Sequence, residues 1–78
     1  MQIEDKVKEI VAELSGETNV SVYASLQEDL ALDSLAMVTL LLEVEDVFSI
    51  ELDESDMNPF DLTTVQSVIN LVNKYDGG

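Results

Sequence analysis

Apolar residues recur at helical spacing at both ends of this chain, and this periodicity limits what it can fold into. In residues 2–15 an apolar residue returns every three or four positions, which predicts an amphipathic helix that Gly16 ends. Residues 63–75 repeat the pattern, and Thr63 and Gln66 have the spacing of a capping box. The two predicted stripes contain Ile3, Val7, Ile10, Val11 and Leu14, then Val65, Val68, Ile69, Val72 and Tyr75.

A further helix is predicted over residues 34–49, where the chain is apolar almost all round the helical wheel. Such a helix is either central to a core or shows part of its apolar surface to a partner. In a domain this small it cannot be wholly enclosed, so we expect some of Met37, Val38 and Leu42 to be reachable from solvent beside Ser34. The arc expected to face the core contains Leu40, Leu41, Val44, Val47 and Phe48, with Leu35, Val38 and Leu42 outside it.

Two irregular segments connect the predicted helices. Residues 17–33 have no sustained period, but their recurring apolar residues predict an ordered loop that packs over the core, with a helical turn near residues 26–30. Residues 53–58 predict a short third helix that Asp53 or Ser55 caps and that Pro59 does not allow to continue. The sequence therefore predicts one all-α domain over residues 1–78, a four-helix bundle with three main helices, a short third helix and a long loop between helices I and II.

Composition excludes several classes of function. The chain has no Cys and no His, so it offers no thiolate and no neutral-pH proton relay, and no metal site is expected. Seventeen acidic residues against three lysines give a formal charge of −14, which repels nucleic acid and favours basic protein surfaces as partners. We see neither a membrane span nor the layout of a signal peptide, and we expect a cytoplasmic protein.

Ser34 lies where the irregular acidic segment gives way to the apolar helix. Asp33 is a good N-cap, which would place the Ser34 hydroxyl in the first helical turn, near unpaired amides that favour a phosphate. On physical grounds alone, plain helix capping is by far the more frequent explanation of Asp-Ser at a helix start. A nucleophilic serine would need an activating base, and the chain has neither a His nor a G-x-S-x-G motif. No catalytic residue is therefore expected.

Residues 28–52, EDLALDSLAMVTLLLEVEDVFSIEL, resemble the region of acyl carrier proteins that surrounds the phosphopantetheine attachment site, with D-S-L at residues 33–35. Residues 45–48 look like the end of the family's second helix, and residues 62–66 like the start of its last helix. The resemblance covers essentially the whole chain, apart from an enlarged connection at residues 57–60. It implies an acyl-carrier-protein-like bundle in which 4′-phosphopantetheine, transferred from coenzyme A by a phosphopantetheinyl transferase, is attached to Ser34.

The resemblance also implies roles for the neighbours of Ser34. Asp33 would cap the helix and hold the attachment site in shape, and Leu35 would tie the helix start to the core. Enzymes that load, condense or modify acyl groups would use basic patches on their own surfaces to dock on the carrier. The carrier itself is expected to be a monomer. The residues assigned to partner contact are Val38, Leu42, Glu45, Asp46 and Met37, for which core packing or a solvated face is the alternative.

The function implied is the carriage of acyl intermediates as thioesters for fatty acid, polyketide or related specialised biosynthesis. Fatty acid carriers usually place acidic residues just after D-S-L, where this chain has Ala36 and Thr39, and a smaller residue is more usual at Leu32. A dedicated pathway is thus at least as consistent with the sequence. Two alternatives stay open: an aminoacyl or peptidyl carrier of a nonribosomal pathway, and an acidic helical adaptor without a prosthetic group.

Overall fold

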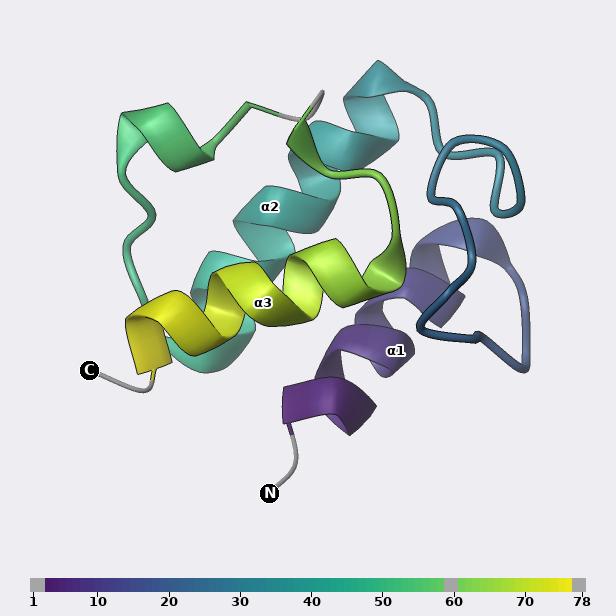
Figure 1. Ribbon diagram of the computed structural model, residues 1–78, viewed down its shortest axis with the longest axis horizontal. Coiled ribbons are helices and arrows are strands. Elements are labelled where there is room, and N and C mark those ends of the chain that lie inside the picture. Colours follow the sequence, from purple (N-terminus) through teal and green to yellow (C-terminus); the bar gives the residue numbers. More distant parts are fainter. Residues whose placement is uncertain (1–2, 59–60, 77–78) are drawn as a thin grey trace.

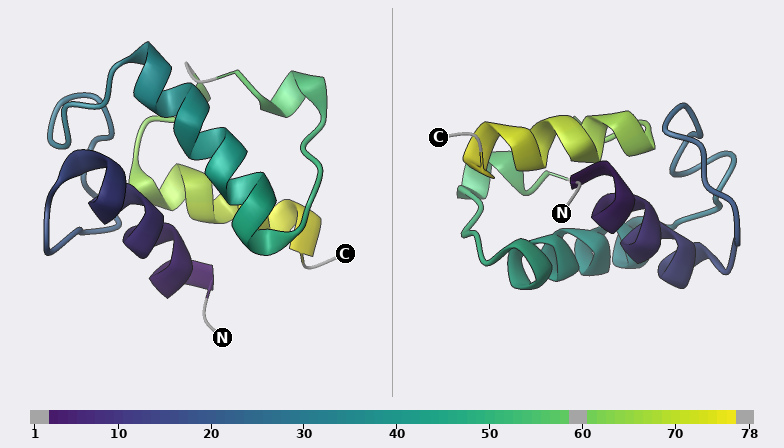
Figure 2. Two further views of the ribbon diagram at one scale, coloured as in Figure 1. Left: turned by 180° about the vertical axis from the view of Figure 1, so that it is seen from behind. Right: turned by 90° about the horizontal axis from the view of Figure 1, so that it is seen from below.

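The computed structural model describes residues 3–58 and 61–76, which form three α-helices around one apolar core (Figure 1). α1 spans Ile3–Ser15, α2 spans Ser34–Phe48 and α3 spans Val65–Asp76, and each helix contacts the other two. In the view from below, α2 and α3 lie at opposite edges with α1 beside them (Figure 2). Within the described residues there is no strand and no helix long and apolar enough to cross a membrane. The predicted all-α fold is confirmed.

α1 forms as its periodicity predicts. Val7, Ile10 and Val11 are buried on one face, and the acidic residues lie elsewhere on the helix. Gly16 follows in a left-handed conformation, with φ of 80°, and its N–H donates to the Ala12 carbonyl over 2.8 Å. A residue with a side chain would be strained at this φ, so glycine suits the end of the helix.

α3 buries the predicted stripe, but its capping box lies one residue later than predicted. Because the helix begins at Val65, Thr64 occupies the N-cap and Ser67 the third helical position. The Ser67 N–H lies 3.4 Å from Thr64 Oγ1, and the Thr64 N–H lies 3.4 Å from Ser67 Oγ. The pairing predicted between Thr63 and Gln66 is therefore wrong, and the Gln66 amide instead donates to Asn70.

The long loop between α1 and α2 is ordered and is fastened to the start of α3. The carbonyls of Val22 and Ala24 accept from the N–H groups of Gln66 and Val65, which α3 itself cannot satisfy. The Leu26 N–H returns a hydrogen bond to the Thr63 carbonyl over 2.9 Å. The apolar residues of the loop that these bonds hold in the core are Val20, Leu26, Leu30 and Leu32.

Residues 25–30 form the predicted turn. The Ser25 carbonyl accepts from the N–H groups of Asp29 and Leu30, and the Ser25 hydroxyl accepts from the Glu28 N–H. One carboxylate oxygen of Asp29 accepts in return from the Ser25 N–H over 2.8 Å. Not every apolar residue of the loop packs down as expected, because Tyr23 stands out from a turn at Ser21 and remains 84% exposed.

The connection from α2 to α3 is held at its start by polar contacts. Ser49 ends α2 in a left-handed conformation, with φ of 54°, and the Ile50 N–H donates to the Glu45 carbonyl. The predicted third helix is only the 3₁₀ turn η1, Glu54–Asp56, which the Asp53 carboxylate caps through the Ser55 N–H. Pro59, predicted to stop this helix, lies outside the described residues.

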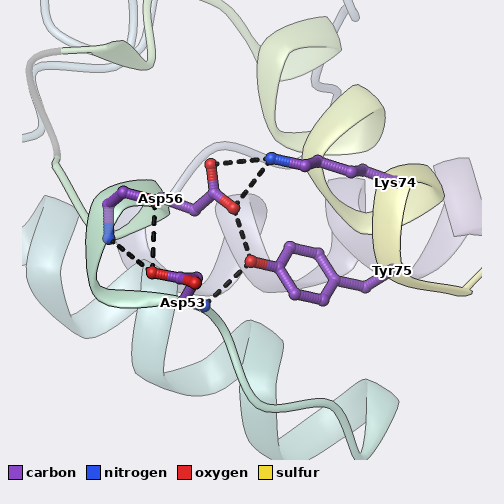
Figure 3. A network of polar contacts seen from close by, with 5 residues as sticks. Asp53, Asp56, Lys74 and Tyr75 are labelled. Atoms are coloured by element: carbon purple, nitrogen blue, oxygen red, sulfur yellow. Dashed lines mark hydrogen bonds and ion pairs between the residues drawn. The ribbon is translucent and has the colours of Figure 1, made fainter.

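A network of side chains joins η1 to the last turn of α3 (Figure 3). The Tyr75 hydroxyl donates to Asp56 Oδ2 and accepts from the Asp53 N–H over 2.8 Å. Lys74 Nζ lies 2.9 and 3.1 Å from the two carboxylate oxygens of Asp56. The hydrogen bond from Tyr75 and the ion pair with Lys74 lower the pKa of Asp56, and the same contacts raise the pKa values of Tyr75 and Lys74.

This network predicts an acid-sensitive contribution to stability. Because the pKa of Asp56 is lower in the folded chain than in the unfolded chain, its contribution is complete above about pH 4 and is lost as the pH falls through the lowered value. Urea unfolding should show Asp56→Asn less stable than wild type at pH 7, with the difference shrinking toward pH 2. Asp46→Asn, which removes an exposed carboxylate elsewhere, is the charge-matched control. A difference between Asp56→Asn and wild type that is constant over this range would contradict the prediction.

Candidate functional site

The start of α2 is shaped by Asp33, which acts as the N-cap as predicted. Its backbone is extended, with φ of −83° and ψ of −178°, and its Oδ1 accepts from the Ala36 N–H over 2.8 Å. Its carbonyl accepts the first hydrogen bond of the helix, from the Met37 N–H over 2.9 Å. Asp33 therefore uses both its side chain and its backbone to fix where the helix begins and how Ser34 is presented.

Leu32, and not Leu35, ties the site to the core. Leu32 is buried just before the cap, and its N–H donates to the Leu26 carbonyl over 2.9 Å. Leu35 is 75% exposed, so the prediction that it anchors the helix start is wrong. The reason is helical geometry, because Leu35 shares a face with Val38 and Leu42 and points away from the buried face.

Ser34 is the first residue of α2 and is exposed to solvent. Within the part of the chain that the structure describes, its side chain has no hydrogen-bond partner. The first turn of α2 contains no acidic residue, and the nearest carboxylate in the chain, Asp33, is already bonded to the Ala36 N–H. The helix dipole and the amides of the first turn favour an anion here. The Ser34 hydroxyl is thus accessible and lies where a phosphate ester would be stabilised.

The exposed face of α2 continues from Ser34 as an apolar stripe. Leu35, Val38 and Leu42 follow the spacing of one helix face, and Leu42 is 52% exposed. The predicted exposure of Val38 and Leu42 is confirmed. Met37 is wholly buried, however, so its assignment to partner contact is wrong. Its position three and four residues before Leu40 and Leu41 places it on the face that packs into the core.

The two acidic residues near the end of α2 differ in their surroundings. Glu45 is half-buried, and its Oε2 accepts from the Leu52 N–H over 2.8 Å. Its side chain thus braces the connection that follows α2, a role that spacing in the sequence does not indicate. Asp46 is exposed, and within the described residues its carboxylate has no hydrogen-bond partner. Of the two, only Asp46 presents an uncommitted carboxylate next to the apolar stripe.

Comparison with known proteins bears directly on this site. Residues 5–72 match the family described as "Phosphopantetheine attachment site". The chain is also 37% identical over 75 residues to an acyl carrier protein of Buchnera aphidicola subsp. Baizongia pistaciae (strain Bp), an alignment that covers 94% of each protein. The chain belongs to the phosphopantetheine-binding family of acyl carrier proteins. The resemblance drawn from D-S-L and its surroundings is confirmed.

As a member of this family, the carrier is non-catalytic and holds a covalently attached 4′-phosphopantetheine. The start of α2 fits that group, because it combines an accessible hydroxyl with unpaired amides and has no acidic residue in its first turn. The group supplies a thiol, which the carrier lacks because it contains no Cys. The carrier itself contributes a rigid point of attachment and a surface around it.

The cap at Asp33 predicts a specific loss of stability. Asp33→Ala removes the acceptor for the Ala36 N–H and should lower the free energy of unfolding by about 1 kcal/mol, whereas Asp33→Asn should retain most of it. Urea unfolding of the three proteins, with the dependence on denaturant unchanged, measures the difference. Equal stability of Asp33→Ala and Asp33→Asn would show that the cap contributes nothing.

Proposed function

We propose that Ser34 is the attachment residue and that the carrier bears acyl intermediates as thioesters on its 4′-phosphopantetheine arm. The observation that carries the proposal is the Ser34 hydroxyl, which is exposed at the start of α2 and has no hydrogen-bond partner among the described residues. It lies inside D-S-L and inside the residues that match the attachment-site family. In the transfer from coenzyme A, the Ser34 oxygen forms a bond to the phosphorus attached to pantetheine and loses its proton. The P–O bond of the coenzyme A pyrophosphate breaks, and adenosine 3′,5′-bisphosphate leaves. Asp33 holds the helix start in place during this step.

An acyl cargo is favoured over an aminoacyl or peptidyl cargo. The Buchnera relative is named an acyl carrier protein, and the alignment with it covers nearly the whole of both chains. Ala36 and Thr39 occupy the positions where fatty acid carriers usually have acidic residues. The first turns of α2 therefore lack acidic residues that fatty acid synthase enzymes would be expected to recognise. These two residues favour a dedicated acylation pathway over housekeeping fatty acid synthesis.

Partner enzymes would dock on the exposed face of α2 beside Ser34. The apolar stripe Leu35, Val38 and Leu42 offers area to bury, and Asp46 adds a free carboxylate at its far end. The formal charge of −14 adds attraction toward a basic surface over a longer range. A partner enzyme with an apolar groove bordered by basic residues has the chemistry that fits this surface. Glu45 contributes mainly by holding the end of α2 in shape.

The attachment residue is tested by loading the purified carrier with coenzyme A, magnesium and a broad-specificity phosphopantetheinyl transferase. Intact-mass measurement should show one phosphopantetheine added to wild type and none added to Ser34→Ala. The substitution should change stability by only a few tenths of a kcal/mol, because a first-turn Ser and Ala differ little in a helix. Circular dichroism and urea unfolding of Ser34→Ala therefore serve as the folding control.

Three results would count against the proposal. Addition of phosphopantetheine to Ser34→Ala would show that the group is attached to another residue. If wild type is not loaded under conditions that load a known carrier, and Ser34→Ala is functionally silent, the adaptor without a prosthetic group is supported instead. Loading of wild type with aminoacyl but not acyl groups by pathway enzymes would support the peptidyl alternative.

The docking surface is tested with two valines of equal exposure. Val38 and Val47 are each 40% exposed, but Val47 lies roughly 140° around the helix from Leu42 and so off the stripe. Val38→Ser should lower the kcat/KM of the transferase for the carrier by roughly tenfold, as removal of an apolar contact from the centre of an interface does. Val47→Ser should leave it unchanged. Equal effects of the two substitutions would place the contact elsewhere.

A further inference from the structure

The strap, defined here as residues 53–58, belongs to the connection between α2 and α3 and contains no fully buried residue. It lies between Leu52 and Leu62, which are both buried, and it contains η1. None of residues 53–58 and 61 has a buried side chain, and Met57 is only partly buried against the core. The strap runs from the end of α2 toward the start of α3 (Figure 1). Burial therefore holds both flanks of the strap firmly and its middle weakly.

Two of the hydrogen bonds that join the strap to α3 meet at one hydroxyl group. Tyr75 OH accepts from the N–H of Asp53, the residue that caps η1, and donates to the carboxylate of Asp56, the last residue of η1 (Figure 3). It thus bonds both ends of this turn to the C-terminal end of α3. Both bonds exist only when the strap lies against α3, so they are lost together when it moves away.

The neighbouring ion pair is weaker support. Lys74 reaches the Asp56 carboxylate, but its side chain is 63% exposed and most of the pairing is screened by water. The Tyr75 side chain is half-buried and packs against the core, and with two rotatable bonds it loses little freedom by holding its hydroxyl in place. The Tyr75 hydroxyl is therefore expected to stabilise the closed strap more than the ion pair between Lys74 and Asp56 does.

We propose that Tyr75 is a latch for the strap, and that residues 53–58 open and close as a unit separate from the three-helix core. The boundary on the α2 side is Leu52, because its side chain is buried and its N–H is held by Glu45. The latch is a property of the folded chain alone. It requires neither the attachment of a prosthetic group nor the identity of Ser34 as its site.

The test is amide exchange with solvent, measured by NMR on the full chain at neutral pH for wild type and Tyr75→Phe. The variant keeps the ring and removes only the hydroxyl. The informative amides are those of Asp56 and Met57, because their acceptors, the carbonyls of Asp53 and Glu54, are not altered by the substitution. Their exchange should become about tenfold faster, as expected from losing hydrogen bonds to a charged group and a backbone amide. The Leu52 amide should keep the wild-type rate.

Three controls make the result decisive. Tyr23→Phe removes the hydroxyl of the other tyrosine, which is exposed, and should change no exchange rate in the strap. The amides of Leu41 and Val68, in the buried faces of α2 and α3, should be unchanged in Tyr75→Phe. Lys74→Gln, which removes the ion pair with Asp56 and the contact of Lys74 Nζ with the Tyr75 ring but keeps the Tyr75 hydroxyl, should have a smaller effect on Asp56 and Met57 than Tyr75→Phe.

Three outcomes would overturn the latch. Wild-type exchange at Asp56 and Met57 in Tyr75→Phe would show that the hydroxyl does not hold the strap. Equal acceleration of the Leu41 and Val68 amides would show that Tyr75 supports the whole fold and that the strap does not open separately. A full effect of Lys74→Gln with none from Tyr75→Phe would assign the closure to the ion pair.

Discussion

The structure depends on a core that three helices cannot complete by themselves. α1, α2 and α3 each bury one face, the loop between α1 and α2 adds four buried apolar side chains, and the connection between α2 and α3 adds Leu52 and Leu62. Backbone hydrogen bonds from Val22, Ala24 and Leu26 hold that loop against the start of α3. The same bonds satisfy amides at the start of α3 that would otherwise have no partner. Loop and helix therefore stabilise each other, and the position of α2 follows from both.

That arrangement explains how Ser34 is displayed. The buried loop ends at Leu32, which holds the chain in the core one residue before Asp33 caps α2. Ser34 and Leu35 then project outward from a helix whose opposite face is buried. This position combines a capped helix backbone with an accessible side chain, which suits the attachment proposed for Ser34. A long arm attached there would move freely while its anchor stayed in place, as a carrier that presents its cargo to other enzymes requires.

Electrostatics and apolar surface act at different ranges around that point. Of the three lysines, Lys8 forms an ion pair with Glu4 and Lys74 with Asp56. Two of the three positive charges are therefore already paired with carboxylates of the same chain. The remaining acidic surface attracts basic partners over distance, while Leu35, Val38 and Leu42 offer contact area once a partner arrives. The acidic side chains do not act alike, because Glu45 braces the chain after α2 and Asp46 stays uncommitted.

The sequence by itself determined the three α-helices, the end of α1 at Gly16, the cap at Asp33 and the family, because these depend on local spacing and on residues adjacent in the chain. It did not determine which side of α2 faces inward, since a helix apolar nearly all round has no unique buried face. Met37 was assigned to partner contact but is buried, and Val47 was placed on the core-facing arc but is 40% exposed. Nor could it assign the roles of Leu32, Glu45 and Tyr75. Each role rests on a hydrogen bond between parts of the chain that packing brings together. The bonds are those of Leu32 with Leu26, of Glu45 with Leu52, and of Tyr75 with Asp53 and Asp56. They exist only after the loop, the strap and the end of α3 have reached their places in the fold.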